Sequence, residues 1–233
     1  FARSERFDES KIKIERGKIA KSLPALASNS RFKRYALSAD GISPRPIPGE
    51  PNGMHVGTSY EHDETGFSSE DFQMRVAQVD KRAKKIDLLL KEIPGPERIG
   101  PKSADVTLVT WGSQKLSCMD AIGLLKQEGI SANVLHFSYV FPLNPKEIKK
   151  AFSGCKKTIL VENNSTAQFG GMLKQYADQV CDFQILKYDG RQFFADEIAK
   201  EAMMLVKAGF KGKKEIVVCE KDYEYYNTAR YLD

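Results

Sequence analysis

Strand-like and helix-like segments alternate through residues 104–208, and this alternation constrains the fold more than any other feature of the 233-residue chain. Short runs of Val, Ile and Leu alternate with runs of helical length, which is the pattern of βαβ units around a mostly parallel sheet. The expected strands are 105–110, 132–137, 157–162 and 183–187, with an edge strand at 215–219. The expected helices are 113–128, 145–153, 166–179 and 195–208. The sequence therefore predicts an α/β fold with right-handed crossover connections.

The turn after the first expected strand lacks the glycine-rich pattern that a dinucleotide-binding sheet needs. It reads TWGSQKLS, with a single glycine beside a bulky tryptophan. Parallel sheets bind ligands beyond the carboxyl ends of their strands, so backbone N–H groups at Ser113–Gln114 or Thr166–Ala167 could hold an anion there. We favour the competing interpretation, which is helix capping by Ser113 and by Asn164 or Ser165.

Residues 31–60 are rich in Gly, Pro and Ser, and their four prolines exclude a helix. A flexible linker would not need Phe32, Leu37 and Ile47, so we expect an ordered loop that packs against another surface. The loop also carries a dense polar set, namely Arg34, Tyr35, Ser38, Asp40, Ser43 and Arg45. Arginine suits the recognition of carboxylates and phosphates. Hydrogen bonding between domains is the favoured alternative for such a loop.

The most chemically loaded tetrapeptide is Glu61-His62-Asp63-Glu64. Three carboxylates around an imidazole could bind a divalent metal or move protons. Adjacent residues in a loop rarely all reach one ion, however, and a metal site needs better ligand geometry. We therefore favour a polar loop or an interface over a metal site. No Ser-His-Asp or Cys-His arrangement follows from the spacing of the remaining residues. His136 ends a buried-looking strand, and we expect its ring to be satisfied in the core.

A long helix is expected from Ser69 to Glu92, and Pro94-Gly95-Pro96 stops it. Ser69 suits the N-cap, with Glu70 and Asp71 in the first turn, where the helix dipole favours acidic side chains. Apolar residues recur at helical spacing along it: Phe72, Val76, Val79, Ala83, Ile86, Leu89, Leu90 and Ile93. The pattern predicts one amphipathic helix with a continuous apolar stripe.

Charge and composition exclude several classes of partner. The formal net charge is +5, but acidic residues are nearly as frequent as basic ones. The densest basic cluster is flanked by Asp80 and Asp87 and comprises Lys81, Arg82, Lys84 and Lys85. This favours a solvated helix face over a nucleic-acid site. No run approaches the roughly 18 apolar residues of a membrane span, and no signal peptide is visible.

The four cysteines are not arranged as metal or cluster ligands. They stand at positions 118, 155, 181 and 219, without a CxxC pair and without a histidine at zinc-ligand spacing. Reduced thiols in a cytoplasmic protein are the simplest interpretation. An iron–sulfur cluster within this chain is not expected, because such clusters need closely spaced thiolates. The chain begins with Phe1, and we expect it to be a piece of a longer protein.

Three motifs in order carry a resemblance to a known family. FKRYALSADGISPRPIPG is followed by GTSYEHDETG and then by a basic helix that contains KRAKK. The α/β region adds LVTWGS, GLLKQEGISANVLHFSYVFPLNP and ILVENNSTAQFGGMLKQ. Together these motifs resemble the α subunit of the 2-oxoacid:ferredoxin oxidoreductases. The α/β region is similar to their transketolase C-terminal-like domain. The resemblance covers residues 14–210, nearly the whole chain.

The resemblance implies a division of the chain. Residues 1–68 would be the end of the pyrimidine-binding domain and an ordered connecting loop. Residues 69–96 would be the connecting amphipathic helix, residues 97–210 the transketolase C-terminal-like domain, and residues 211–233 a C-terminal extension. The apolar stripe would pack against the α/β domain or a partner subunit. The loop of residues 31–64 would lie near the active-site domain and brace it.

The resemblance also implies a reaction. The family decarboxylates a 2-oxoacid on thiamine diphosphate, passes electrons through an iron–sulfur cluster to ferredoxin, and transfers the acyl group to coenzyme A. The glutamate that activates thiamine lies outside this chain. The diphosphate, Mg²⁺ and cluster sites belong to the β subunit. We therefore expect no catalytic, cofactor or metal residue here, and no bound cofactor. The expected partners are the β subunit and, for the assembled enzyme, ferredoxin.

Two hypotheses from different classes follow. In the first, the chain is a structural part of such an enzyme and is inactive alone. Its EHDETG sequence resembles the 2-oxoglutarate branch of the family more than the pyruvate branch. In the second, the chain is a non-catalytic assembly or binding module that shares the fold but has its own ligand. A nicotinamide-dependent dehydrogenase would bind NAD, which we do not expect.

Overall fold

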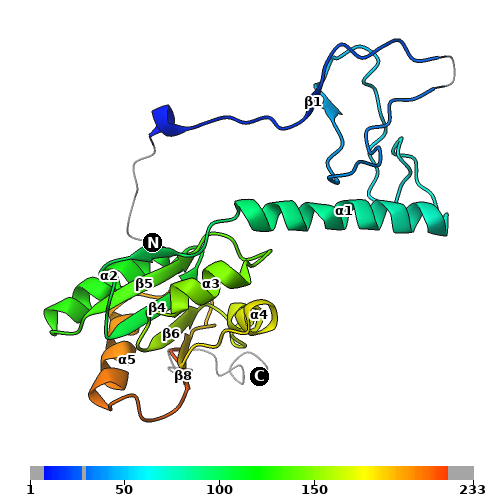
Figure 1. Cartoon of the computed structure of the whole chain (residues 1–233). Coiled ribbons are helices and arrows are strands. Elements are labelled where there is room, and N and C mark those ends of the chain that lie inside the picture. The colour runs from blue at the N-terminus through cyan, green and yellow to red at the C-terminus, as the bar shows by residue number, and fades with distance from the viewer. Residues whose placement is uncertain (1–7, 28–29, 220–233) are drawn as a thin grey trace, which may run out of the picture. The chain divides into compact units, whose positions relative to one another are not determined.

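The computed structural model describes residues 8–27 and 30–219. The chain divides into two compact units, an N-terminal one that ends at Glu92 and a C-terminal one that begins at Ile93. Because the two units are placed independently, each is described by itself. Figure 1 shows that nearly all of the regular β-structure and four of the five labelled α-helices belong to the C-terminal unit.

The C-terminal unit is built on a six-stranded sheet with the order β3-β5-β4-β6-β7-β8. Its strands are β3 (Glu97–Ile99), β4 (Val106–Trp111), β5 (Ala132–Phe137), β6 (Thr158–Glu162), β7 (Phe183–Leu186) and β8 (Glu215–Val217). All neighbours pair in parallel except β3, which runs antiparallel to β5. The predicted mostly parallel sheet is therefore confirmed. The central strands are buried on both faces, which explains their nearly continuous apolar sequence.

Helices cover both faces of this sheet (Figure 1). They are α2 (Gln114–Gln127), α3 (Pro145–Phe152), α4 (Gln168–Ala177) and α5 (Ala195–Lys207). One core cluster joins α2 and α5 to Val106, Leu108 and other side chains that point to one face. The second cluster joins α3 and α4 to Val109, Leu160 and their neighbours on the opposite face. The predicted α/β fold with flanking helices is therefore confirmed.

Strand β3 was not predicted from the sequence. It has only three residues and follows Pro94-Gly95-Pro96, so it is too short to show a period-2 pattern. Its register on β5 pairs Ile99 with Val134 and Glu97 with His136. The Arg98 guanidinium donates to the carbonyl of Ala151 at the end of α3 over 2.6 Å. Tertiary pairing, rather than local propensity, makes this segment a strand.

The N-terminal unit contains little regular structure apart from one long helix. It has a single turn of 3-10 helix, η1 (Glu9–Lys11), and two short parallel strands, β1 (Ile19–Ala20) and β2 (Arg45–Pro46). Ordered loops connect these elements to the long helix α1 (Phe72–Glu92). Gly41, in the turn after Asp40, has a φ of +74° and lies against the α1 backbone. A Cβ at this position would stand 2.3 Å from the carbonyl oxygen of Lys81.

Helix α1 begins three residues later than predicted. The carboxylate of Asp71 accepts from the backbone N–H of Met74 over 2.7 Å, so Asp71 caps the helix. The predicted cap Ser69 instead accepts from the N–H of Asp71 over 3.2 Å. The apolar stripe of α1 is largely exposed, with 72% of Phe72 and 58% of Val76 open to solvent. The helix buries the polar residues Gln78 and Lys81 instead. No described helix is long and apolar enough to cross a membrane.

Candidate functional site

The carbonyl oxygen of Tyr35 joins the N-terminal loop to the two buried polar residues of α1. The side-chain amide of Gln78 donates to this oxygen over 3.1 Å, and the ammonium of Lys81 donates over 2.7 Å. The backbone N–H of Tyr35 donates to the carbonyl of Glu64 over 2.9 Å. One peptide unit therefore ties together helix α1, the loop around Tyr35 and the loop of residues 61–64.

A pocket of about 340 Å³ opens beside this junction. Five of the nine residues singled out from the sequence line it: Arg34, Tyr35, Ser43, Arg45 and His62. Among the described residues that line it, seven are Lys or Arg and none is Asp or Glu. The other four predicted residues, Ser38, Asp40, Glu61 and Asp63, are not in its wall. The pocket is therefore a candidate anion site, and it contains no nucleophile with a matched base.

Two of the predicted acids neutralise basic side chains at the rim. The carboxylate of Asp40 contacts the ammonium of Lys18 and accepts from the N–H of Ile42 over 3.1 Å. The Lys18 contact is the main reason that the pKa of Asp40 falls to about 2. Glu61 binds the Arg82 guanidinium with both oxygens, over 2.6 and 3.0 Å, and this contact lowers the pKa of Glu61. Both acids hold basic side chains in place.

The remaining members of the 61–64 loop have separate structural roles. Burial raises the pKa of Asp63, but hydrogen bonds from Thr65, Phe67 and Gly66 outweigh it and the net pKa is lowered. The shortest of these bonds, from the Thr65 hydroxyl, spans 2.7 Å. The His62 ring packs against the Tyr35 ring with centroids 4.0 Å apart. Its Nδ1 lies 3.0 Å from the carbonyl of Asp63.

Glu64 supports the loop rather than an ion. Its carboxylate accepts from the Lys33 ammonium and from the N–H of Leu37, each over 2.9 Å. The Lys33 contact is the main cause of its lowered pKa. Across residues 8–27 and 30–219, no group of three or more His, Cys, Asp or Glu side chains is placed to hold a metal ion. The geometry therefore supports the polar-loop interpretation of Glu61–Glu64.

Ser38 and Ser43 both help to shape the loop. The Ser43 hydroxyl donates to the carbonyl of Ala36 over 2.8 Å. The carbonyl of Ser38 accepts from the N–H of Gly41 over 3.1 Å and closes the tight turn at Asp40. Arg45 pairs with Ile19 in the small sheet and donates to the carbonyl of Arg16 over 3.0 Å. These bonds fix the backbone of the loop and hold Arg45 in the pocket wall.

Sequence reasoning missed eight of the thirteen residues that line this pocket. Lys81, Arg82 and Lys85 come from the basic cluster of α1, which the sequence analysis interprets as a solvated face, and Gln78 lies one turn before it. Lys81 is in fact only 6% exposed. Burial is the main cause that lowers the pKa of Lys81 to about 8, and the nearby charges of Lys85 and Arg34 add to it. The i, i+3 and i+4 spacing of Gln78, Lys81 and Lys85 put them on one helix face. Nothing in the sequence marked that face as the buried one.

The second predicted anion site, at the carboxyl ends of the strands, is partly filled by the chain itself. The buried carboxylate of Glu162, at the end of β6, accepts from the N–H of Phe169 over 2.8 Å in the first turn of α4. Asn164 accepts from the N–H groups of Thr166 and Gln168 over 3.1 and 3.2 Å. Asn164 therefore accepts from the first N–H group of α4, although the N-cap position itself is Ala167, which makes no side-chain capping bond. The sequence did not identify Glu162 as the second acceptor.

The start of α2 lacks the side-chain cap that the sequence predicts. The Ser113 side chain makes no capping hydrogen bond, so the prediction of a Ser113 cap was wrong. Ser113 has helical backbone angles, with φ −68° and ψ −19°, because the sharp turn is made one residue earlier by Gly112 at φ +60°. An N-cap side chain needs an extended backbone to reach the next turn. Asn144, whose ψ is 104°, has that geometry, and its side chain accepts from the N–H groups of Lys146 and Glu147 at the start of α3.

His136 is only partly satisfied in the core. Its Nε2 lies 3.2 Å from the carbonyl of Gly112, whereas its buried Nδ1 has no hydrogen-bond partner among the described residues. Burial lowers the pKa of His136 and favours the neutral ring. The neutral ring donates through Nε2, and Nδ1 is the unpaired acceptor.

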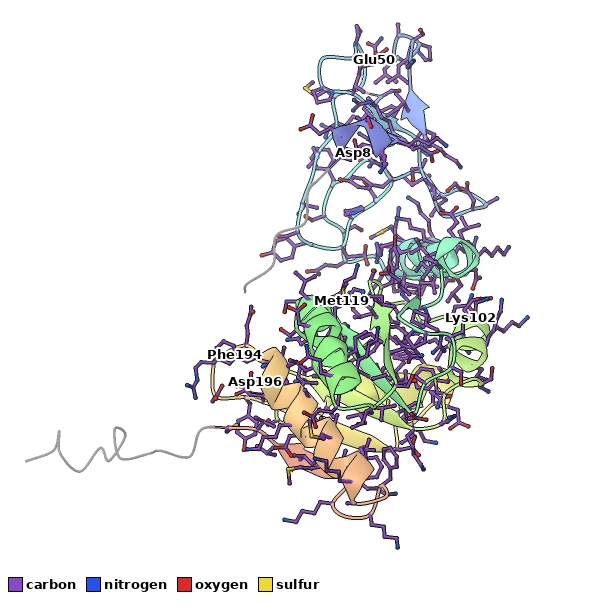
Figure 2. All side chains as sticks on the ribbon, turned by 90° about the vertical axis from the view of Figure 1, so that its left-hand side faces the viewer. Asp8, Glu50, Lys102, Met119, Phe194 and Asp196 are labelled. Atoms are coloured by element: carbon purple, nitrogen blue, oxygen red, sulfur yellow. The ribbon has the colours of Figure 1, made fainter. Side chains whose placement is uncertain are left out.

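A buried ion pair closes the same edge of the sheet. Lys187, which follows β7, is 1% exposed, and its ammonium donates to both oxygens of Glu197 over 2.7 and 2.8 Å. Glu197 also accepts from the N–H of Phe194 over 2.8 Å and thereby caps α5. Figure 2 labels Phe194 and Asp196 at this end of the helix. The pair is structural because the ammonium and both carboxylate oxygens bind groups of the chain itself.

Comparison with known proteins identifies the family of the C-terminal unit. Residues 97–199 match the family model of the transketolase C-terminal domain. They include every element from β3 to the first turn of α5. The mostly parallel sheet with helices on both faces is therefore that of a transketolase C-terminal domain.

Relatives that match nearly the whole chain identify the family. The chain is 32% identical over 208 residues to the α subunit of 2-oxoacid:ferredoxin oxidoreductase 2 from Aeropyrum pernix, covering 88% of this chain and 31% of that protein. It is also 32% identical to the α subunit of 2-oxoacid:ferredoxin oxidoreductase 1 from Sulfurisphaera tokodaii, covering 89% and 32%. The chain belongs to this α-subunit family, as the sequence motifs indicated. It spans about a third of the length of these relatives.

A solved structure supports the same assignment. The 2-oxoglutarate:ferredoxin oxidoreductase from Magnetococcus marinus, solved with 2-oxoglutarate, coenzyme A and succinyl-CoA bound, superposes with a TM-score of 0.67 at 25% identity. The match covers 88% of this chain and 34% of that chain. It therefore includes residues from both units of the chain.

Proposed function

We propose that this chain forms a structural part of the α subunit of a 2-oxoacid:ferredoxin oxidoreductase. The observation that carries the proposal is the likeness to such α subunits over nearly nine-tenths of the chain. In the proposed enzyme a 2-oxoacid is decarboxylated and oxidised, and its acyl group passes to coenzyme A. The chemistry is that of thiamine diphosphate and an iron–sulfur cluster, which carries the electrons to ferredoxin.

The described residues do not fit a resident site for those cofactors. Cys118 and Cys181 are buried, and burial raises the pKa of each thiol to about 12, so neither is poised as a thiolate ligand. The described residues also lack a carboxylate cluster that could hold Mg²⁺. We therefore assign thiamine diphosphate, Mg²⁺ and the cluster to the remaining α-subunit domains and to a β subunit. This chain contributes no step of the reaction in our proposal.

Within the enzyme, the C-terminal unit would be a rigid platform and the N-terminal loop a brace. The loop is held by the Tyr35 junction and by the Glu61–Arg82 pair, so it can present a fixed surface to a neighbouring domain. We propose 2-oxoglutarate as the preferred substrate, on the strength of the EHDETG sequence and the Magnetococcus marinus structure. A cytoplasmic location fits the four cysteines, none of which forms a disulfide.

Reconstitution tests the proposal. The purified chain is assayed alone and after co-expression with the remaining α-subunit domains and a β subunit. The readout is reduction of methyl viologen in the presence of thiamine diphosphate, Mg²⁺ and coenzyme A. We expect no reduction by the chain alone and steady reduction by the complex. The rate with 2-oxoglutarate should exceed the rate with pyruvate.

Three outcomes would count against the proposal. Turnover by the chain alone would show that it is not merely structural. Failure of the chain to co-purify with a β subunit would favour an independent binding module of the same fold. A higher rate with pyruvate would contradict the proposed substrate while leaving the family assignment intact.

A further inference from the structure

The basic pocket in the N-terminal unit has far more positive charge than the protein neutralises. Of the seven Lys and Arg residues in its wall, only Lys18 and Arg82 form an ion pair with a carboxylate among the described residues. The other five are Arg16, Arg34, Arg45, Lys81 and Lys85. They come from three separate stretches of the chain, so no single local sequence preference accounts for their meeting.

Several of these cations are held in place without being neutralised. The Arg34 guanidinium lies 5.3 Å from the centre of the Tyr35 ring. Arg45 donates to the carbonyl of Arg16 over 3.0 Å. Both contacts orient a guanidinium but leave several of its five N–H donors available. Such pre-oriented guanidinium groups suit bidentate binding of phosphate oxygens.

Lys81 is the most informative of the five. Only 6% of Lys81 is exposed to solvent. Its ammonium nevertheless donates to a single neutral acceptor, the carbonyl of Tyr35. An ammonium has three donors, and a buried cation without a paired anion is costly. Like charges on Lys85 and Arg34 add to that cost. The bond to Tyr35 joins α1 to the loop but does not neutralise the ammonium, and the nearby Glu64 carboxylate offsets its charge only in part. An anion that enters the pocket would supply the missing negative charge.

We propose that this pocket binds the phosphate groups of a small molecule that carries at least two phosphates. One carboxylate would offset only one of five cations, whereas a diphosphate offsets several and presents oxygens in more than one direction. A volume of about 340 Å³ accommodates a diphosphate with part of an attached group. This volume lies within the roughly 300–1,000 Å³ that is typical of small-molecule pockets, which favours a small molecule.

Two sources can supply this chemistry. Coenzyme A carries a diphosphate and a third phosphate, and it is a substrate of the proposed enzyme. A free nucleoside diphosphate carries the same diphosphate without the pantetheine arm. The pocket itself is inferred from this chain alone and does not depend on the proposed function.

Calorimetric titration of the 233-residue chain tests the proposal, with inorganic pyrophosphate as the primary probe. We expect saturable binding that weakens steeply between 50 and 200 mM salt, because several ionic contacts contribute. Arg34→Gln and Lys85→Gln should each weaken pyrophosphate binding about tenfold, since each removes one charge-assisted contact. Lys91→Gln makes the same charge change on α1 outside the pocket and should leave binding unchanged. Far-UV circular dichroism verifies that each variant is folded.

The remaining arms identify the source and the alternative. Tighter binding of coenzyme A than of dephospho-coenzyme A and ADP would assign the site to coenzyme A. Equal binding of ADP and coenzyme A would assign it to a nucleotide diphosphate. No saturable pyrophosphate binding, or an equal loss in Lys91→Gln, would overturn the proposal. Tighter binding of an acidic peptide than of any phosphate compound would overturn it in favour of a protein segment. A failed reconstitution would not affect any of these results.

Discussion

The two units of this chain bury opposite kinds of residue. In the C-terminal unit the strand residues Val106, Leu108 and Val109 are completely buried, and apolar side chains fill both faces of the sheet. In the N-terminal unit the buried positions on the long helix are Gln78 and Lys81, while its apolar stripe is exposed. The C-terminal unit is therefore stabilised by burial of apolar area. The N-terminal unit depends on hydrogen bonds and ion pairs.

This difference has consequences for stability. Burial of apolar area contributes roughly 25 cal/mol per Å² and is not screened by salt. Hydrogen bonds contribute only about 1 kcal/mol each, and exposed ion pairs contribute less and are screened. We therefore expect the C-terminal unit to be the stable platform. We expect the N-terminal unit, which is held by such polar contacts, to be the less stable of the two and the more sensitive to salt.

The largest expected effect is a core truncation in the platform. Leu160 in β6 is completely buried, and Leu160→Ala should lower the free energy of unfolding by about 3–5 kcal/mol. Val76→Ala, on the exposed stripe of α1, should change it by less than about 0.5 kcal/mol. Urea titration followed by far-UV circular dichroism measures both. Equal losses would show that the stripe is packed in solution and would remove the contrast between the units.

A second substitution tests whether polar groups can also be essential within the platform. Glu197→Ala should lower the free energy of unfolding by about 3 kcal/mol, because it leaves the buried Lys187 ammonium without its carboxylate. Glu201→Ala, on the same helix and without a recorded ion pair among the described residues, is the matched control. We expect it to cost less than about 0.5 kcal/mol. Similar values for the two variants in thermal unfolding would contradict the structural role of the pair.

The smallest expected effect is a pH dependence that originates in the N-terminal unit. The pKa of Lys81 is lowered to about 8 in the folded chain, below its ordinary value of 10.5. Between these two values the unfolded state binds more protons, so the contribution of Lys81 makes stability rise with pH. The rise should be about 1 kcal/mol between pH 7 and pH 9, and Lys81→Met should abolish it. NMR titration of the lysine side chains should show one resonance that titrates near pH 8.

Comparison with the Lys81→Met variant is necessary because two buried thiols of the C-terminal unit make stability fall as the pH rises. Burial raises the pKa of Cys118 and Cys181 to about 12, so both thiols contribute stability that is lost as the pH rises above their unfolded pKa of about 8.5. The difference in pH dependence between the unsubstituted chain and the Lys81→Met variant gives the contribution of Lys81. A Lys81 resonance that titrates near pH 10.5 would show that its ammonium is not desolvated.

The sequence predicted the structure of the C-terminal unit well and that of the N-terminal unit poorly. The apolar period of β4 to β7 indicated a parallel sheet, and the Asn144-Pro145 pair marked the start of α3. Strand β3 was missed because only its pairing with β5 makes it a strand. Within the N-terminal unit, α1 buries Gln78 and Lys81 against the carbonyl of Tyr35, which hydrophobic periodicity does not indicate. The packing of its apolar stripe against the α/β domain or a partner subunit stays a prediction.

The candidate site shows the same limit at the level of single residues. Arg34, Tyr35, Ser43, Arg45 and His62 were singled out from the sequence because polar residues in an ordered loop often have a role. Lys81 and Lys85 were set aside, because alternating charges on a helix are typical of a solvated surface. No local pattern distinguishes a lysine that faces water from one that faces a carbonyl oxygen 46 residues away in sequence.

By itself, the sequence determined the fold class, the order of the main elements and the family. These depend on the periodicity of apolar residues and on local motifs, both of which are recognisable from residues close together in the sequence. Only the tertiary structure decided which polar side chains are buried and which cations share a pocket. Burial and charge compensation depend on distances between residues that are far apart in sequence. That is why the basic pocket of the N-terminal unit became visible only once its segments were brought together.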